Sequence, residues 1–233
     1  MTTATFVLVH GAWHGAWCWQ PLGAVLEGRG VAHDALDLPS SSGLDASVDM
    51  NADVLALRRF CHDRGPVVLV AHSYAGAVVA EAAPKIEGLA GIVYLAALVP
   101  RVGQTASDVT REYGLRSALD ATIRRDDVGF LHLDPEPASL ALYGDCDAAT
   151  RQWAINKVSP QTFASFRTVR TSENIAVASA YVVCTRDQSL VPDVQEQVAL
   201  RCDEVVRMDS DHSAFLSHPD KVADLFESLN FRA

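Results

Sequence analysis

The sequence predicts one α/β domain: a mostly parallel sheet of about six strands with helices on both faces and a helical cap inserted into it. A chain of 233 residues, 49% hydrophobic and 21% charged, is long enough for one domain with a sizeable core, and its composition is that of a soluble globular protein. Short β-rich runs alternate along the chain with longer helical patterns, which is typical of a parallel sheet covered by helices. Residues 101–171 break this alternation.

Most of the expected strands are continuous apolar runs, as suits strands that are buried on both faces. They are Thr5–Val9, Val31–Leu36, Val67–Val70, Gly91–Leu95, Tyr181–Cys184 and Val205–Met208. The expected helices lie between and after these strands, and the first three stop at a glycine or a proline. They are Pro21–Glu27, Asp45–Arg64, Tyr74–Ala83, Asp193–Leu200 and Asp220–Leu229. In the second helix, Val48, Ala52 and Leu55 form the expected apolar face.

Residues 101–171 contain no convincing strand, several short helical pieces and the sequence Asp134-Pro135-Glu136-Pro137. An insertion of about seventy residues above a parallel sheet is the usual form of a cap or lid. Residues 1–100 and 172–233 then form the core of the domain. The alternative is a set of extra helices packed on the edge of the sheet.

The charge balance argues against nucleic acid and anionic membranes as partners. Asp and Glu number 29 against 19 Lys and Arg, which gives a net charge of −10, and no basic run is present. The longest apolar run, from about Leu89 to Pro100, is too short to span a bilayer. A signal peptide is not expected, because no positive charge precedes the first apolar residues. Five scattered cysteines, an odd number with no C-x-x-C pair, predict reduced thiols and a cytoplasmic protein.

Ser73 is the first candidate for chemistry. The apolar run Val67–Val70 continues through Ala71 and His72 into this serine, and a helix rich in small residues follows. A strained strand-to-helix turn of this kind, the nucleophile elbow, lifts a serine hydroxyl above a sheet. The elbow pattern has Gly two residues before and after the serine, whereas this chain has Ala71 and Ala75, with Gly76 one place later. A structural serine at a strand end is the alternative.

A serine needs a general base, and His212 is the best placed of the eight histidines. It follows the last expected strand across the short loop 209–211, and the carboxyl ends of parallel strands meet at one edge of a sheet. His72 is adjacent to Ser73, but neighbouring side chains diverge at such a turn, so we expect a structural role for it. His132 in the cap is either a substrate contact or part of the solvated surface.

The third member of a triad is a carboxylate that orients the imidazole. Asp187 follows the strand Tyr181–Cys184 at the same edge, in a loop closed by Val191-Pro192. Asp209 and Asp211 compete for this role, but they share the histidine's own loop and would have to fold back on it. The chain order Ser73, Asp187, His212 is that of α/β-hydrolases.

An oxyanion hole requires two backbone N–H groups, one just after the serine and one from a loop that follows an early strand. Tyr74 supplies the first by position. The strand Thr5–Val9 leads into His10-Gly11-Ala12-Trp13, where glycine lets the backbone pass close to the site, and Ala12 is the expected second donor. Trp13 begins an aromatic loop that is expected to contact substrate.

Metal and nucleotide sites are disfavoured. His10, His14 and Cys18 recur every four residues, as metal ligands on a helix would, but Gly11, Gly15 and the preceding strand indicate a loop. Gly28-Arg29-Gly30 ends a helix before a strand and is not a dinucleotide-binding loop, and no P-loop or H-E-x-x-H motif occurs. We therefore expect neither a metal nor an organic cofactor.

Residues 6–19, Phe-Val-Leu-Val-His-Gly-Ala-Trp-His-Gly-Ala-Trp-Cys-Trp, strongly resemble the start of plant methyl esterases of the salicylate-binding and methyl-jasmonate type. Bacterial esterases and plant hydroxynitrile lyases share this pattern. Residues 35–39, the Ser73 elbow, residues 184–187 and the pair 211–212 recur in the family order, and the similarity spans nearly the whole chain. The resemblance implies an α/β-hydrolase fold, the triad Ser73, His212 and Asp187, oxyanion donors at Ala12 and Tyr74, and a homodimer.

Two positions favour the esterase branch over the lyase branch. Hydroxynitrile lyases resemble this chain but carry Thr after the first-strand histidine and Lys after the catalytic histidine, where this chain has Gly11 and Ser213. Without that lysine, a leaving cyanide loses its electrostatic stabiliser. The leading hypothesis is a serine hydrolase that cleaves carboxylic esters of small, apolar or aromatic substrates, with Gly11, Trp13 and Ser213 near the substrate.

Two other hypotheses remain open because fold alone does not decide function. The same triad could act in lactone or thioester hydrolysis, in natural-product cyclisation, or in C–C or cyanohydrin cleavage. The chain could also be a small-molecule receptor without turnover, although an intact triad with both oxyanion positions disfavours this.

Overall fold

The computed structural model describes residues 4–113, 117–229 and 231. Its main sheet has six strands, all parallel, in the order β2-β1-β3-β4-β8-β9. Their bounds are β1 Thr5–Val9, β2 His33–Leu36, β3 Val67–His72, β4 Leu89–Leu95, β8 Ser179–Cys184 and β9 Glu204–Met208. All six strands expected from the sequence are present. Every residue of β3 is buried, as the unbroken apolar run predicts for a central strand.

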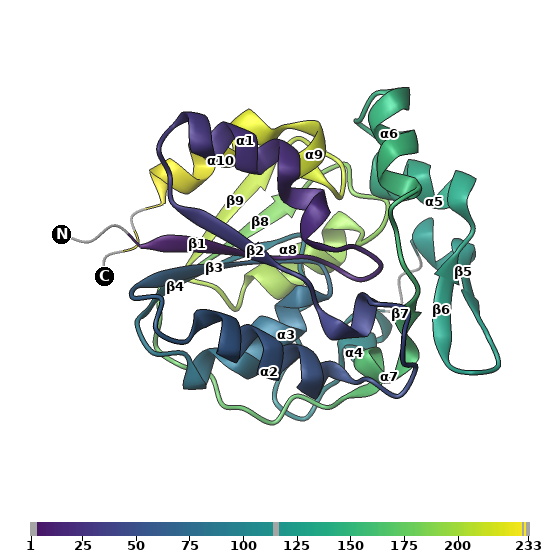
Figure 1. Ribbon diagram of the computed structural model, residues 1–233, viewed down its shortest axis with the longest axis horizontal. Helices are drawn as coiled ribbons and strands as arrows, with labels where there is room; N and C mark the ends of the chain where they lie inside the picture. The colour runs from purple at the N-terminus through teal and green to yellow at the C-terminus, as the bar shows by residue number, and fades with distance from the viewer. Residues whose placement is uncertain (1–3, 114–116, 230, 232–233) are drawn as a thin grey trace.

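Helices cover both faces of the sheet. Figure 1 shows α1 and α10 on one face and α2 and α3 on the other. The helices of the core are α1 Gln20–Gly28, α2 Met50–Cys61, α3 Ala75–Ala82, α8 Pro192–Ala199, α9 Ala214–Ser217 and α10 Pro219–Ser228. Short 3-10 turns are η1 Ala16–Trp19, η2 Pro39–Ser41 and η3 Ala83–Lys85.

The second helix differs from its expectation in both its start and its buried face. It begins at Met50 rather than Asp45, because the Asp49 side chain accepts a hydrogen bond from the Asn51 N–H and caps the helix there. Leu55, expected on the apolar face, is 48% exposed. The buried face instead carries Met50, Asp53, Val54, Leu57 and Cys61.

The segment between β4 and β8 lies beyond the carboxyl ends of the strands (Figure 1). It contains α4 Ala106–Glu112, η4 Leu119–Thr122, β5 Ile123–Arg125, β6 Phe130–Leu133, α5 Pro135–Leu142, α6 Ala148–Ile155, β7 Gln161–Thr162 and α7 Phe163–Arg167. The expectation that residues 101–171 hold no strand is wrong, since β5, β6 and β7 form an antiparallel sheet. These strands have two to four residues each, too few to show a periodic pattern. No helix within the described residues is both long and apolar enough to cross a bilayer.

Candidate active site

Ser73 stands at the carboxyl end of β3, in a turn with φ of 53°. A non-glycine residue in this left-handed region is strained, and such strain is characteristic of a nucleophile elbow. The Ser73 carbonyl accepts hydrogen bonds from the N–H groups of Gly76 and Leu98, at 3.0 and 2.9 Å, which hold the turn. Ser73 is partly exposed, whereas His72 and Tyr74 on either side are buried.

Close packing explains the small residues around the serine. Ala71 and Ala75 are fully buried where β3 passes into α3. A Cβ atom on Gly76 would lie 2.5 Å from the Leu98 carbonyl oxygen and 2.9 Å from Ala97 Cβ. The position that requires glycine in this elbow is therefore 76, while alanine fits at 71 and 75.

His212 and Asp187 form a buried pair at the same edge of the sheet. His212 Nδ1 lies 2.6 Å from Asp187 Oδ2, with side-chain exposures of 1% and 0%. Asp187 Oδ1 also accepts hydrogen bonds from the N–H groups of Ser189 and Leu190, and Oδ2 accepts one from Gln195 Nε2. These donors fix the carboxylate, and the carboxylate fixes the imidazole with its other nitrogen available.

The two competing carboxylates have other partners. Asp209 is exposed and pairs with Arg186 at 3.0 Å. Asp211 accepts hydrogen bonds from the Asp145 N–H and the Ser217 hydroxyl, and burial raises its pKa. Of the three candidates, it is Asp187 that contacts the imidazole of His212.

His72 links the Ser73 turn to the His212 loop. Its Nε2–H donates to the His212 carbonyl oxygen at 3.0 Å, and the two ring centroids are 4.5 Å apart. Within the described residues, no hydrogen bond joins the Ser73 hydroxyl to His212; such bonds are commonly loose before substrate binds. The structural role expected for His72 matches these contacts.

The loop after β1 passes directly against the serine. A Cβ atom on Gly11 would lie 2.9 Å from Ser73 Cβ and 2.9 Å from His72 Nδ1, so only glycine fits there. Ala12 and Tyr74 are buried, and neither of their N–H groups has an acceptor among the residues that the structure describes. Unpaired buried N–H groups are rare in proteins. Tyr74 directly follows Ser73, and Ala12 directly follows Gly11, which packs against Ser73, as expected for the two donors of an oxyanion hole.

Both ring nitrogens of His10 and of His14 form hydrogen bonds within the protein. His10 Nδ1 donates to the Gly11 carbonyl and its Nε2 accepts from the Leu38 N–H. His14 Nδ1 donates to the Ala12 carbonyl at 2.8 Å, so its Nε2 accepts from the Tyr143 hydroxyl at 2.8 Å. Burial lowers the pKa of His10 to about 4 and that of His14 to about 3. Both rings are neutral and hold the loop through these hydrogen bonds, which leaves no ring nitrogen free to bind a metal.

An apolar cavity of about 180 Å³ opens beside Ser73. Besides Ser73 it is lined by Trp13, Leu98, Ala106, Ser107, Thr110, Leu119, Asp120, Ile123, Leu131, Phe163, Phe166, Ser189 and Leu190. Most of these residues belong to α4, η4, β5, β6 and α7, between β4 and β8. The inserted segment thus forms most of the wall.

The sequence anticipated the lining only in part. Trp13 lies on the wall as expected, but Gly11 and Ser213 do not, because Gly11 packs behind Ser73 and Ser213 is fully buried. Leu131 and Phe163 are among the apolar residues of the inserted segment that line the cavity, whereas Tyr143 is buried and bonds His14. Thr110, Leu119 and Phe166 carry no sequence signal that would have identified them.

His132 lies away from the cavity wall and pairs with Asp126 at 2.9 Å in an exposed position. Of its two interpretations, the solvated surface therefore fits the structure.

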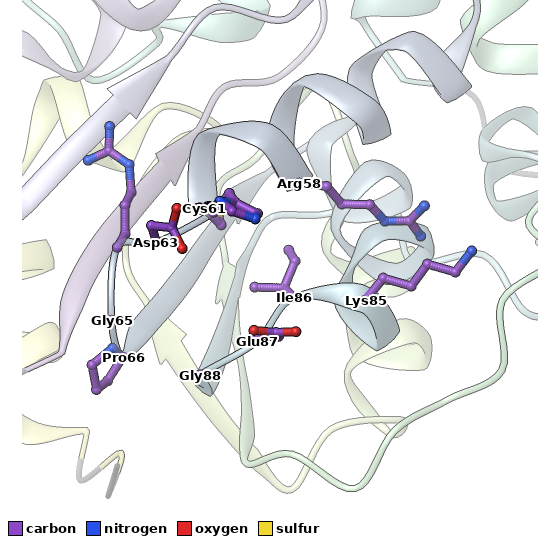
Figure 2. A pocket seen from close by; sticks show the side chains of 11 residues that line it. Arg58, Cys61, Asp63, Gly65, Pro66, Lys85, Ile86, Glu87 and Gly88 are labelled. Atoms are coloured by element: carbon purple, nitrogen blue, oxygen red, sulfur yellow. Dashed lines mark ion pairs between the residues drawn. The ribbon is translucent and has the colours of Figure 1, made fainter.

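A second hollow, of about 310 Å³, lies at the opposite edge of the sheet, beside the end of α2 and the starts of β3 and β4 (Figure 2). It contains Cys61, whose pKa burial raises to about 11, so the thiol is protonated at neutral pH and is a poor nucleophile. Arg58 there donates to the backbone carbonyls of Glu81 and Ala82. This hollow offers no activated nucleophile.

Comparisons with known proteins agree with the geometry of the Ser73 site. The model of the alpha/beta hydrolase family matches residues 6–225. The chain belongs to this family. Salicylic acid-binding protein 2 of Nicotiana tabacum is 30% identical to this chain, over 95% of each of the two chains. The carbendazim hydrolyzing esterase of Nocardioides sp. (strain SG-4G) is 31% identical, over 70% of this chain and 71% of that one.

The solved structure of a pyrethroid hydrolase from Sphingobium faniae JZ-2 superposes on the hydrolase with a TM-score of 0.82, at 22% identity and over 97% of each chain. This likeness confirms the fold, an α/β-hydrolase fold with a mostly parallel sheet. The resemblance to salicylate-binding proteins and bacterial esterases, stated from the sequence, is also confirmed. Relatives named as esterases support a carboxylic-ester hydrolase.

Proposed function

We propose that the hydrolase cleaves carboxylic esters of compact apolar or aromatic acids through an acyl-enzyme on Ser73. The observation that carries this proposal is the buried His212–Asp187 pair beside a strained, partly exposed serine. The backbone N–H groups of Ala12 and Tyr74 have no acceptor among the described residues, as expected of oxyanion donors. These observations together support acyl transfer at this edge of the sheet.

The reaction follows from this arrangement. The Ser73 oxygen attacks the ester carbonyl carbon while His212 Nε2 takes the hydroxyl proton, and Asp187 stabilises the resulting imidazolium. The carbonyl oxygen becomes an oxyanion and accepts hydrogen bonds from the N–H groups of Ala12 and Tyr74. The carbon–alkoxy bond then breaks, and the alcohol leaves with the proton from His212. Water, deprotonated by His212, then attacks the acyl-enzyme, the bond between the acyl carbon and the Ser73 oxygen breaks, and His212 returns the proton to Ser73 as the acid leaves.

The size and lining of the cavity support compact acyl groups. A dry apolar cavity of about 150 Å³ is known to hold benzene, so about 180 Å³ suits a short aliphatic or a single-ring acyl group. Phe163, Phe166 and Trp13 offer aromatic surface to such a group. Among the described residues that line the wall, Asp120 is the one with a formal charge, and it repels an anionic substrate, as does the net charge of the chain.

The substrate class is tested by kcat/KM for p-nitrophenyl acetate, butyrate, benzoate and palmitate, and for a dicarboxylate monoester. Benzoate or the short-chain esters should be the best substrates. If palmitate or the charged ester is best, the account of the cavity is wrong even should the triad remain. Lactone, thioester and cyanohydrin substrates, measured alongside, decide whether the same triad serves another reaction.

The nucleophile is tested with a fluorophosphonate probe, which should label the wild-type protein but not Ser73→Ala. Labelling that persists in the variant would place the nucleophile on another residue. If the wild-type protein shows neither labelling by the probe nor ester turnover, the result favours the hypothesis of a small-molecule receptor.

A further inference from the structure

The loop that carries Ala12 is held in a strained conformation by the inserted segment. Trp13 has φ of 63°, a left-handed conformation that is unusual for a bulky residue and persists only when its surroundings enforce it. Its N–H donates to Gln161 Oε1 at 3.2 Å, and its carbonyl accepts from the Ser159 N–H at 2.8 Å. Its indole N–H donates to the Leu131 carbonyl at 2.9 Å. All three partners lie between β4 and β8.

Gln161 is the polar centre of this contact. It is fully buried, and its amide makes four hydrogen bonds. Oε1 accepts from the Trp13 N–H and from the Ser41 hydroxyl, while Nε2 donates to the hydroxyls of Ser40 and Ser165. The backbone donor fixes which end of the amide faces Trp13. The whole hydrogen-bonding capacity of this side chain is thus used inside the protein.

The same network continues to the other arm of the oxyanion hole. The Ser40 hydroxyl and N–H both donate to Asp53, at 2.6 and 2.9 Å. The Tyr74 hydroxyl donates to Asp53 Oδ2 at 2.7 Å. Asp53 is fully buried and has no cationic partner within the described residues. Burial raises its pKa, while the bonds from Ser40 and Tyr74 lower it.

We propose that Gln161 and Asp53 are positioning residues of the oxyanion hole. Through Trp13 and Tyr74 they hold the N–H groups of Ala12 and Tyr74 at a fixed spacing, so that both meet the developing oxyanion. The inference rests on the proposed esterase function. It gives the inserted segment a second role besides walling the cavity, since the oxyanion hole is complete only when Gln161 is in place.

The test uses Gln161→Leu, with Gln152→Leu as the matched control. Gln152 lies in the same segment but is exposed, and Asn156 is the one hydrogen-bond partner of its side chain among the described residues. Removing one oxyanion donor outright costs on the order of 10²- to 10³-fold in kcat, so displacing one should cost roughly 10- to 100-fold. In Gln161→Leu, kcat for p-nitrophenyl butyrate should fall by that factor while KM changes little. Gln152→Leu should match the wild type.

A second readout separates positioning from simple structural damage. Phenylboronic acid forms a tetrahedral adduct with a serine nucleophile and so reports on the oxyanion hole, whereas neutral benzamide reports on ground-state binding in the cavity. The affinity of Gln161→Leu for the boronate should fall by about the same factor as its kcat, while its affinity for benzamide should equal that of the wild type. An equal loss for both ligands would show a collapsed cavity and contradict the proposal.

Tyr74→Phe reaches the same network from its other end and keeps the ring that packs against Phe166 at 5.1 Å. It keeps the proposal testable should Gln161→Leu fail to fold. Its kcat should also fall, and the double variant should lose less than the product of the two single losses, as expected for one network. The proposal is overturned if boronate affinity and kcat of the folded variants stay within about twofold of the wild type. Activity that survives Ser73→Ala would instead overturn the proposed function.

Discussion

The two hollows at opposite edges of the sheet each have a hydroxyl or thiol on their wall, with a histidine and an aspartate nearby. Ser73 lines the first hollow, and the buried pair His212–Asp187 lies at the same edge, whereas Cys61, His62 and Asp63 line the second in direct succession. Both contain a short histidine–aspartate contact, at 2.6 Å for His212–Asp187 and 2.7 Å for His62–Asp63. A count of such contacts would not distinguish them.

Burial distinguishes the two hollows. The side chains of His212 and Asp187 are 1% and 0% exposed, whereas those of His62 and Asp63 are 76% and 87% exposed, where water and salt screen the interaction. The exposure of the serine and the cysteine shows the opposite trend. Cys61 is buried and its pKa is raised, whereas Ser73 is partly exposed beside the cavity. A triad needs a buried orienting pair and an accessible nucleophile, and the edge where strands end supplies both.

The largest effect is expected from Ser73→Ala. Loss of a triad serine costs on the order of 10⁶-fold in kcat, because no covalent intermediate can form. Initial rates with p-nitrophenyl butyrate measure this loss. Cys61→Ala is the matched change in the other hollow and should leave kcat unaltered. Comparable losses in the two variants would remove the distinction between the edges.

Asp187→Asn should come next, at about 10⁴-fold in kcat, because an amide favours the wrong imidazole tautomer. Asp63→Asn in the exposed pair should have no effect, and Asp211→Asn should have a much milder one. If Asp211→Asn were the more damaging variant, the orienting acid would lie in the loop of His212 itself.

Acidification should destabilise the fold through the buried histidines. The pKa of His10 is about 4 and that of His14 about 3 in the folded protein, against 6.5 for the free side chain. The unfolded chain therefore binds more protons, and stability falls as pH drops below about 6.5, down to about pH 4 through His10 and about pH 3 through His14. At pH 5 each of these two histidines has lowered the free energy of unfolding by about 2 kcal/mol.

Burial also lowers the pKa of His72, which adds to this loss, whereas the raised pKa values of Asp53 and Asp211 oppose it. Urea unfolding at pH 7, 6 and 5 measures the trend, and His14→Gln should make it shallower. His62→Gln at the exposed site should leave it unchanged. A stability that does not vary between pH 5 and 7 would contradict the neutral state of these rings.

The smallest effect is expected from alkylation of Cys61. With a pKa of about 11, on the order of one thiol in a thousand is ionised at pH 8. Iodoacetamide should therefore modify Cys61 slowly in the folded protein and rapidly in urea, as mass spectrometry of peptides can show. Rapid modification of the native protein would mean that this hollow is more open and more reactive than its burial implies.

The sheet and the residues placed at its edge were predictable because both depend on local signals. Continuous apolar runs mark the strands, and the residues that follow β3, β8 and β9 must share one edge when the strands are parallel. The contact between His212 and Asp187 lies where that argument expects it. The Ser73 elbow was recognisable although glycine stands at 76 rather than at 75.

The polar network was not predictable, because each member depends on a distant partner. Asp53 is not indicated by the sequence, since the apolar pattern predicts a buried face of Val48, Ala52 and Leu55, whereas Asp53 lies on the face that is in fact buried. Gln161 belongs to a two-residue strand that pairs with β6, a contact that no local pattern indicates. The strain at Trp13 is likewise set by contacts far along the chain.

The hydrogen bond between Trp13 and Gln161 can form only late in the synthesis of the protein. Its two residues are 148 positions apart. At about 5 to 20 residues per second, the ribosome needs roughly 7 to 30 s to make the second after the first. Until then the left-handed turn at Trp13 has no partner to enforce it, and the sheet still lacks β8 and β9. The turn at Trp13 therefore gains the partner that stabilises it only late in synthesis of the chain.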